Sequence, residues 1–277
     1  MKKYLLMIVV MFLGFSTISS AQAENQKTLV IIDSAINSSK FSNIVYEVCI
    51  TVKSCVNGIE GAGTANVDSQ SWSIKGIEHG HSVVSSAIQA NPNIKIIFIR
   101  VTDINKYPTF SAIHSDGAML SKSLQWVINN SIKFNIGAVS ISQVRDNFPK
   151  GTCPKDESFS SSVQSLKKIN IPVFVAVGNN AKWDHPSYPA CITDVYGVGA
   201  TKPNGQLAPY THGGIGQDIV ALGESNITDI KGLSIKVYGT SISTPVAASI
   251  LLSKYNGENW DDLINSYPNL NNSKVIK

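Results

Sequence analysis

The sequence predicts an α/β fold in which a mostly parallel, doubly wound sheet lies between two layers of helices. Short apolar runs recur along the chain without alternating polar side chains, which is typical of strands covered on both faces. Stretches with helical periodicity fall between these runs. An alternation of strands and helices favours a parallel sheet with helices on both sides, so we expect a three-layer architecture.

The predicted strands are the continuous apolar runs, which are rich in Ile and Val. They lie at Leu29–Asp33, Ile94–Val101, Ile136–Ile141, Val173–Val177 and Val195–Ala200. The predicted helices lie at His79–Gln89, Ser121–Asn130, Ser158–Lys168 and Ser241–Lys254. The segment Cys49–Ile74 has little periodicity and is expected to be an irregular loop, at most with a hairpin. The polar end of the chain, Tyr255–Lys277, is expected to form one short helix near Trp260–Ile264 and then a loose tail.

Residues 1–23 have the features of a secretory signal peptide. Lys2 and Lys3 give a positive start, Tyr4–Phe15 is almost wholly apolar, and Ala21-Gln22-Ala23 is a small-x-small cleavage site. The apolar stretch is shorter than the roughly 20 residues of a bilayer span. We therefore expect cleavage after Ala23 and a secreted or periplasmic product without a stable membrane span. Residues 24–277 then suit one domain, since single domains run to about 250 residues.

The charge limits the classes of partner, and the cysteine content predicts disulfides. The formal net charge is +4 and no basic run interleaves with aromatic residues, which argues against nucleic acid as a partner. The four cysteines are Cys49, Cys55, Cys153 and Cys191. An even number in an exported chain suggests two disulfides, with three pairings open, and the spacing is not the paired C-x₂-C kind of a structural zinc site.

Polar residues stand where a doubly wound fold collects its functional groups. Asp33 ends the first predicted strand, His79 opens a helix, Asn179 follows another strand, and Ser241 lies between a small-residue turn and an apolar helix. Sites in such folds gather at the carboxyl ends of strands, and a helix N-terminus favours developing negative charge. Each residue alone has a commoner structural role in a turn or a cap. Together they are the residue types of a nucleophilic site.

Five motifs resemble those of the subtilisin-like serine proteases, the subtilases. Leu29–Ser34 resembles the family's strand that ends in Asp-Ser-Gly. His79-Gly80-His81-Ser82-Val83 resembles its helix start His-Gly-Thr-His-Val, and Val173–Asn179 resembles the strand that carries its oxyanion asparagine. Ser187–Ala190 and Gly197–Ala200 together are similar to the family's stretch that contains Tyr-Pro-Ala and Val-Gly-Ala. The fifth motif, Gly239-Thr240-Ser241 with Pro245, is similar to Gly-Thr-Ser-Met-Ala-x-Pro. The resemblance covers nearly the whole chain after the signal peptide.

The resemblance implies a subtilisin-like fold and a serine endopeptidase that cleaves peptide or protein substrates through an acyl-enzyme. Ser241 would supply the nucleophilic Oγ, and His79 would take its proton. Asp33 would fix the imidazole tautomer, while Asn179 and the Ser241 N–H would stabilise the oxyanion. His81 is the competing base, but His79 directly precedes the glycine, as the catalytic histidine of the family does.

The chain departs from the family at the strand edge that pairs with the substrate backbone. Ser140-Ile141-Ser142-Gln143 stands where the family usually has Ser-Leu-Gly-Gly. Ser142 and Gln143 are therefore expected to narrow or polarise one wall of the first specificity pocket. The residues expected to line the substrate site are Ser140, Ile141, Ser142 and, from the Tyr-Pro-Ala stretch, Ser187.

Further expectations come from the same comparison. Only Glu24–Lys27 separates the signal peptide from the first strand, so a short family member without a pro-domain or autocatalytic maturation is expected. No carboxylate-rich loop follows Asp33, so we expect no metal or other cofactor beyond weak calcium binding through carbonyl groups. The Tyr-Pro-Ala segment of the family lies beside the cleft, which favours a Cys153–Cys191 bridge and leaves Cys49–Cys55 to close a short loop.

Two other functions stay open. The altered substrate edge would also suit a catalytically idle subtilase fold that binds peptides or a partner protein. An esterase or another acyl-transfer enzyme could use the same triad on a different substrate.

Overall fold

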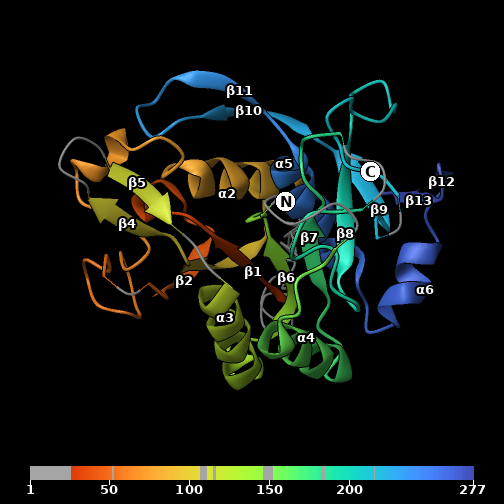
Figure 1. Cartoon of the computed structure of the whole chain (residues 1–277), viewed down its shortest axis with the longest axis horizontal. Helices are drawn as coiled ribbons and strands as arrows, with labels where there is room; N and C mark the ends of the chain where they lie inside the picture. The colour runs from red at the N-terminus through yellow and green to blue at the C-terminus, as the bar shows by residue number, and fades with distance from the viewer. Residues whose placement is uncertain are drawn as a thin grey trace, which may run out of the picture.

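The main sheet of the computed structural model has nine strands. The structure describes residues 26–51, 53–106, 111–114, 117–145, 152–181, 185–214 and 216–277, so the predicted signal peptide lies outside the described residues. The strands are β1 (Thr28–Asp33), β2 (Ile44–Cys49), β3 (Lys95–Arg100), β6 (Ile136–Ile141), β7 (Val173–Ala176), β8 (Tyr196–Thr201), β9 (Ile219–Leu222), β12 (Asn269–Leu270) and β13 (Ser273–Val275). Their order is β12-β13-β9-β8-β7-β6-β1-β3-β2, and all neighbours are parallel except β12 and β13 (Figure 1).

Helices cover both faces of this sheet. On one face lie α2 (His79–Ala90) and α5 (Thr240–Lys254), and on the other lie α3 (Gly117–Asn130) and α4 (Glu157–Lys168) (Figure 1). The smaller described elements are η1 (Ser38–Lys40), η2 (Ser71–Ser73), β4 (Asp103–Lys106), β5 (Ser111–His114), β10 (Glu224–Thr228), β11 (Ser234–Tyr238) and α6 (Trp260–Asn265). The predicted three-layer α/β architecture is therefore confirmed.

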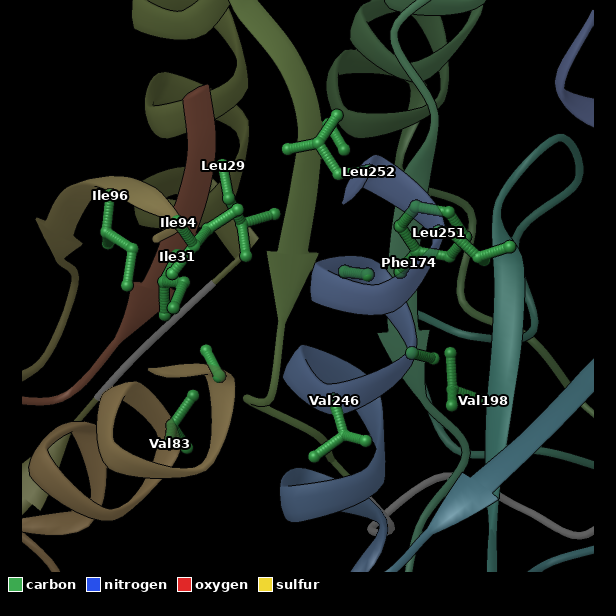
Figure 2. Close-up of a cluster of buried hydrophobic side chains, with 14 of the residues drawn as sticks. Leu29, Ile31, Val83, Ile94, Ile96, Phe174, Val198, Val246, Leu251 and Leu252 are labelled. Atoms are coloured by element: carbon green, nitrogen blue, oxygen red, sulfur yellow. The ribbon is translucent and has the colours of Figure 1, made fainter. Parts of the chain in front are cut away.

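Strand β1 shows why the apolar runs do not alternate with polar residues. Leu29 and Ile31 pack into the core beneath α2 and α5 (Figure 2), whereas Val30 and Ile32 pack into the core on the α3 and α4 side. All four side chains are fully buried. A strand between two helical layers needs apolar side chains on both faces, because each face is removed from water.

The strand order reverses at β1, which lies between β3 and β6. The register sets Asp33 at the end of β1 opposite Arg100, and Ile32 opposite Ile141. The carboxyl ends of β1, β3 and β6 therefore meet at one edge of the sheet. This is the position at which doubly wound folds place their ligands.

The prediction of a loose tail at the C-terminus is wrong. After α6, residues 269–275 form β12 and β13, and β13 pairs in parallel with β9. Val275 and Ile276 are almost completely buried. These strands span only two and three residues, too short for a periodic pattern. They form because the open edge of β9 offers unpaired backbone groups that need partners.

Arg100 ties the sheet to the irregular segment that leads into α2. Its guanidinium is fully buried and donates four hydrogen bonds, to the carbonyls of Ser54, Asn66 and Thr102 and to the Ser54 hydroxyl, over 2.7–3.1 Å. Burial lowers the pKa of Arg100 to about 10, against the charges of Asp103 and Asp68. One side chain thus organises a segment that has little hydrophobic core of its own.

We expect Arg100→Ala to lower the free energy of unfolding by about 3 kcal/mol, because it leaves buried carbonyl groups without donors. Arg100→Lys should recover only part of the loss, since an ammonium group lacks the planar fork that reaches several carbonyls. Thermal melts of both variants, beside the exposed Lys122→Ala on α3 as control, would check this. An Arg100→Ala melt equal to that of the control would contradict it.

Both expected disulfides are present in the structure. Cys49 is bonded to Cys55 at the end of β2, and Cys153 is bonded to Cys191 near the start of α4. The second bridge spans 38 residues of sequence and the first spans six. None of the helices within the described ranges is both long and apolar enough to cross a membrane.

Because loop closure restricts the unfolded chain more when the loop is longer, the two bridges should differ in their effect on stability. We expect a loss of about 4 kcal/mol from replacing both Cys153 and Cys191 by Ser, and about 2 kcal/mol for the Cys49 and Cys55 pair. Differential scanning calorimetry of the two double variants would then show about twice the fall in Tm for the longer loop. An equal or reversed order would disprove the loop-length argument.

Candidate active site

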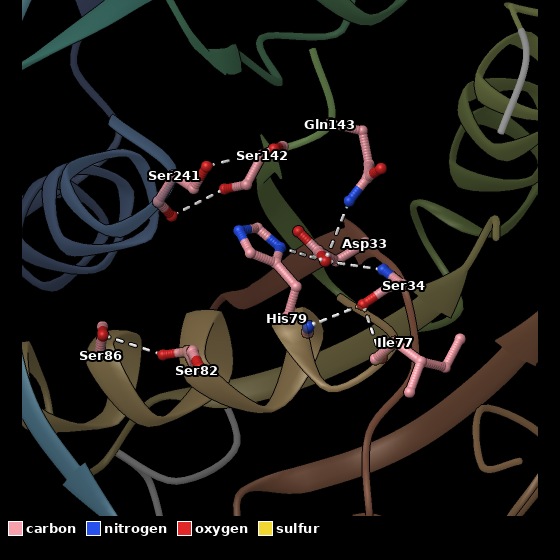
Figure 3. Close-up of polar contacts among 10 residues, drawn as sticks. Asp33, Ser34, Ile77, His79, Ser82, Ser86, Ser142, Gln143 and Ser241 are labelled. Carbon is pink, nitrogen blue, oxygen red and sulfur yellow. Dashed lines mark hydrogen bonds and ion pairs between the residues drawn. The ribbon is translucent and has the colours of Figure 1, made fainter. Parts of the chain in front are cut away.

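Asp33 and His79 form a bonded pair at the carboxyl edge of the sheet. The His79 Nδ1 and the Asp33 Oδ1 are 2.7 Å apart, with Asp33 fully buried and the His79 side chain 34% exposed (Figure 3). Ser34 links the end of β1, which carries Asp33, to the start of α2, which carries His79. Its hydroxyl accepts from the Gly80 N–H and donates to the Ile77 carbonyl, both at 2.9 Å. The start of α2 is thereby attached to the end of β1.

The environment of His79 favours its protonated form. Loss of water contact by itself lowers the pKa of His79, but the charge of Asp33, the hydrogen bond to Asp33 and the charge of Glu78 raise it above its ordinary value. The buried Asp33 thus orients the imidazole and stabilises a positive charge on it. The second ring nitrogen, Nε2, remains available for a proton-transfer partner.

His81 has a structural role in the fold. It is buried, its Nε2 lies 3.0 Å from the Thr228 carbonyl, and its ring packs against Phe41. Burial lowers the pKa of His81 below its ordinary value, despite the hydrogen bond to Thr228. Of the two histidines, only His79 reaches the carboxylate.

Ser241 lies on the opposite side of the His79 ring from Asp33 (Figure 3). It occupies the second position of α5, where a helix has no carbonyl for the backbone N–H. Its Oγ donates to the Ser142 carbonyl at 3.5 Å, and the Ser142 Oγ donates to the Ser241 carbonyl at 2.9 Å. Pro245 explains the second bond, because it has no N–H to give to the carbonyl four residues earlier.

Asn179 is held beside the start of α5 in a defined orientation. Its Oδ1 accepts from the Thr240 N–H at 2.8 Å and from the Thr240 Oγ1 at 3.1 Å. The amide oxygen is therefore engaged, and the exposed side chain keeps its NH₂ group for another acceptor. Gly239 permits this approach, since its φ is 142° and a Cβ there would lie 3.2 Å from the Asn179 Nδ2.

All four residues expected to line the substrate site, Ser142 included, are buried in the structure. Ser140 and Ile141 have no exposed surface, because they lie inside β6 between its neighbours. Ser187 is also buried, with its Oγ 3.2 Å from the His212 Nδ1. It packs behind Gly178, where a Cβ would come within 2.3 Å of the Ser187 Oγ. Of the four, only Ser142 touches the candidate nucleophile.

Gln143 has a contact that the sequence did not indicate. It is half-buried, and its Nε2 donates to the Asp33 Oδ1 at 3.1 Å (Figure 3). The sequence placed Gln143 beside Ser142 in the wall of the specificity pocket, but both side chains turn toward the Asp, His and Ser group. No sequence signal identifies this contact, which depends on β6 lying next to β1.

The described residues include no group of three or more His, Cys, Asp or Glu side chains that could ligate a metal. The site contains a carboxylate, an oriented imidazole, a hydroxyl at a helix N-terminus and an adjacent amide donor. This combination suits transfer of an acyl group to a serine hydroxyl.

We expect His79 and His81 to titrate on opposite sides of about pH 6.5, the ordinary value for histidine. Asp33 stabilises the His79 imidazolium, whereas burial disfavours a charge on His81. NMR titration of histidine-labelled Ser241→Ala protein, with resonances assigned through single His→Gln variants, would measure both. The opposite order, with His81 titrating above His79, would contradict the analysis.

The chain is similar to known proteins in sequence and in fold. The family model of the subtilases, peptidase family S8, matches residues 26–266. Subtilisin BL of Lederbergia lenta is 25% identical over 191 residues, which are 67% of this chain and 66% of that protein. An alkaline protease of Alkalihalobacillus alcalophilus is 26% identical over 174 residues, 62% of this chain and 41% of that protein. The chain thus aligns with less than two thirds of the length of these relatives.

Solved structures show the same fold. The nisin leader peptidase NisP of Lactococcus lactis superposes with a TM-score of 0.66 at 18% identity, over 91% of this chain and 86% of that chain. The protease domain of PatA superposes with a TM-score of 0.68 at 14% identity, over 91% and 92%. Since the family model spans most of the sequence and these folds agree, the chain belongs to the subtilase family.

Proposed function

We propose that this chain is a serine endopeptidase in which Asp33, His79 and Ser241 form the triad and Asn179 completes the oxyanion hole. The contact that carries the proposal is the 2.7 Å bond from His79 to the buried Asp33, on the ring edge away from Ser241. Membership of the subtilase family supports the reaction class. The alternative histidine, His81, is bonded to a backbone carbonyl instead.

The geometry supports the following reaction. Ser241 Oγ attacks the substrate carbonyl while His79 Nε2 takes its proton, and Asp33 stabilises the resulting imidazolium. The Asn179 amide and the Ser241 N–H donate to the oxygen that becomes negative. The carbon–nitrogen bond then breaks, and the amine leaves with the proton from His79. Water next attacks the acyl-enzyme while His79 takes its proton, and His79 returns a proton to Ser241 Oγ as the acid product leaves.

In the resting structure the Ser241 hydroxyl donates to the Ser142 carbonyl, at a long 3.5 Å. Catalytic hydrogen bonds are often loose in a free enzyme and tighten when the substrate binds. A rotation about χ1 of Ser241 would redirect the hydroxyl proton to His79. Substrate binding would favour this rotation by competing for the Ser142 carbonyl.

We further propose that the substrate lies extended beside residues 142–144. This segment follows β6, and the sheet does not pair its backbone. A peptide could therefore add as a strand there, with its scissile bond near Ser241. The nisin leader peptidase and a leader-peptide-processing protease of Staphylococcus aureus, EpiP, share this fold, which agrees with a peptide or protein substrate.

We propose that the protein works outside the cytoplasm. The two disulfides support this, because such bonds form and persist in oxidising compartments. The signal-like residues 1–23 agree with export.

Ser241→Ala should abolish labelling by a fluorophosphonate probe and reduce peptide hydrolysis by about 10⁴-fold or more, because the attacking oxygen is lost. His79→Ala should cost a comparable factor, whereas His81→Ala should cost far less in folded protein. Asn179→Ala should retain labelling but lose about 10²–10³-fold in turnover through the oxyanion. Active-site labelling and cleavage of a diverse peptide library would measure these effects.

The same measurements separate the other candidate functions. Absence of labelling in the wild-type protein would indicate a catalytically idle fold that binds peptides. Labelling with turnover of small esters but no peptide cleavage would indicate an esterase. Labelling that persists in Ser241→Ala would show that another nucleophile reacts.

A further inference from the structure

The carboxylate of Asp33 accepts three hydrogen bonds, and two of the donors, Ser34 and Gln143, lie outside the Asp, His and Ser group. Its Oδ1 accepts from the His79 ring at 2.7 Å, the Ser34 N–H at 2.6 Å and the Gln143 Nε2 at 3.1 Å. The Oδ2 has no hydrogen-bond partner among the described residues. Every hydrogen bond that orients this carboxylate therefore converges on one oxygen atom.

Gln143 reaches this oxygen from a neighbouring strand. The residue lies two positions after the end of β6, which pairs in parallel with β1 up to Ile32. An ionised carboxylate only accepts hydrogen bonds, so the NH₂ end of the amide must face it. Of the other two donors, Ser34 belongs to the same segment as Asp33 and His79 is the group to be oriented. Gln143 is thus the donor that ties the carboxylate to β6.

We infer that Gln143 is a positioning residue, which fixes the Asp33 carboxylate for His79 and weakens the negative charge that His79 experiences. The inference deepens the proposed function and rests on it for the effect on turnover. A hydrogen bond to a charged group is worth more than a neutral one, so a single amide can restrain a carboxylate that lacks a partner on its other oxygen.

The charges that face His79 set the direction of the effect. Asp33 on β1 and Glu78 just before α2 are the negative groups that act on it. Ser241 on α5 and Gln143 after β6 are neutral. The positive end of the Gln143 amide points at the Asp33 Oδ1 and offsets part of its potential. Removal of this amide should therefore stabilise the imidazolium and raise the pKa of His79.

The first test needs no activity. In Ser241→Ala protein, Gln143→Met removes the donor and keeps the side-chain length, and NMR titration should show the His79 pKa displaced upward. Gln125→Met, an exposed glutamine on α3, is the matched control and should leave it unchanged. In Asp33→Asn protein the Gln143→Met change should have no further effect, because the acceptor charge is gone.

The second test uses the protein with Ser241 intact. Gln143→Met should lower kcat for peptide hydrolysis by about three- to tenfold and leave KM nearly unchanged, because the loss is one of orientation rather than substrate contact. The acid limb of the pH profile should move upward with the His79 pKa. Gln143→Ala, which removes the donor without placing a new apolar side chain in the site, should show the same pattern.

The outcomes separate this inference from the proposed function. An unchanged His79 pKa in both Gln143 variants would overturn the inference, as would a change in KM alone, which would assign Gln143 to the cleft wall. An upward shift in protein that cleaves no peptide would support the contact with Asp33 and refute the proposed protease activity instead.

Discussion

The parallel ladder that joins β1 to β3 and β6 is the constraint on which the site depends. Because parallel strands end at one edge of a sheet, the residues that follow them are brought together without any local signal in the sequence. Asp33, Arg100 and the Ser142–Gln143 pair are separated by many residues, yet they lie at neighbouring strand ends. A change in the register of β1 would displace all of these side chains relative to one another.

The buried charge of Asp33 determines how the surrounding elements are attached. A carboxylate removed from water needs donors, and these come from Ser34 directly after β1, from α2 and from Gln143 shortly after β6. The same residues that satisfy the charge also set the position of His79. Stabilisation of the fold and orientation of the imidazole are therefore linked, since movement of the helix start or of the β6 end would remove one of the three donors to the buried carboxylate.

Helix α5 illustrates a similar link between packing and chemistry. Its small and apolar side chains are buried almost all round, which places its N-terminus deep in the molecule against the sheet. Pro245 deprives the Ser241 carbonyl of its helical donor, and Ser142 supplies one at 2.9 Å from the neighbouring strand end. The start of the helix is thus held by a contact across the site, in addition to the Asn179 clamp on Thr240.

The sequence by itself determined the architecture and the candidates for the nucleophile, the base and the carboxylate that orients the base. Continuous apolar runs and intervening helical stretches are local properties, and residues such as Asp33 and Ser241 stand beside them in recognisable motifs. The main-sheet strands β2, β9, β12 and β13 were not predicted. Strand β2 lies at an edge of the sheet and its first three residues are not buried, so it lacks the continuous apolar run of a central strand. The other three are short, and short segments form strands only when a neighbouring edge offers hydrogen bonds. The tertiary structure alone decided that Ser140, Ile141 and Ser187 are buried, and that Gln143 meets Asp33. Such contacts depend on which strands are neighbours, and neighbourhood is a property of the whole sheet rather than of any local segment.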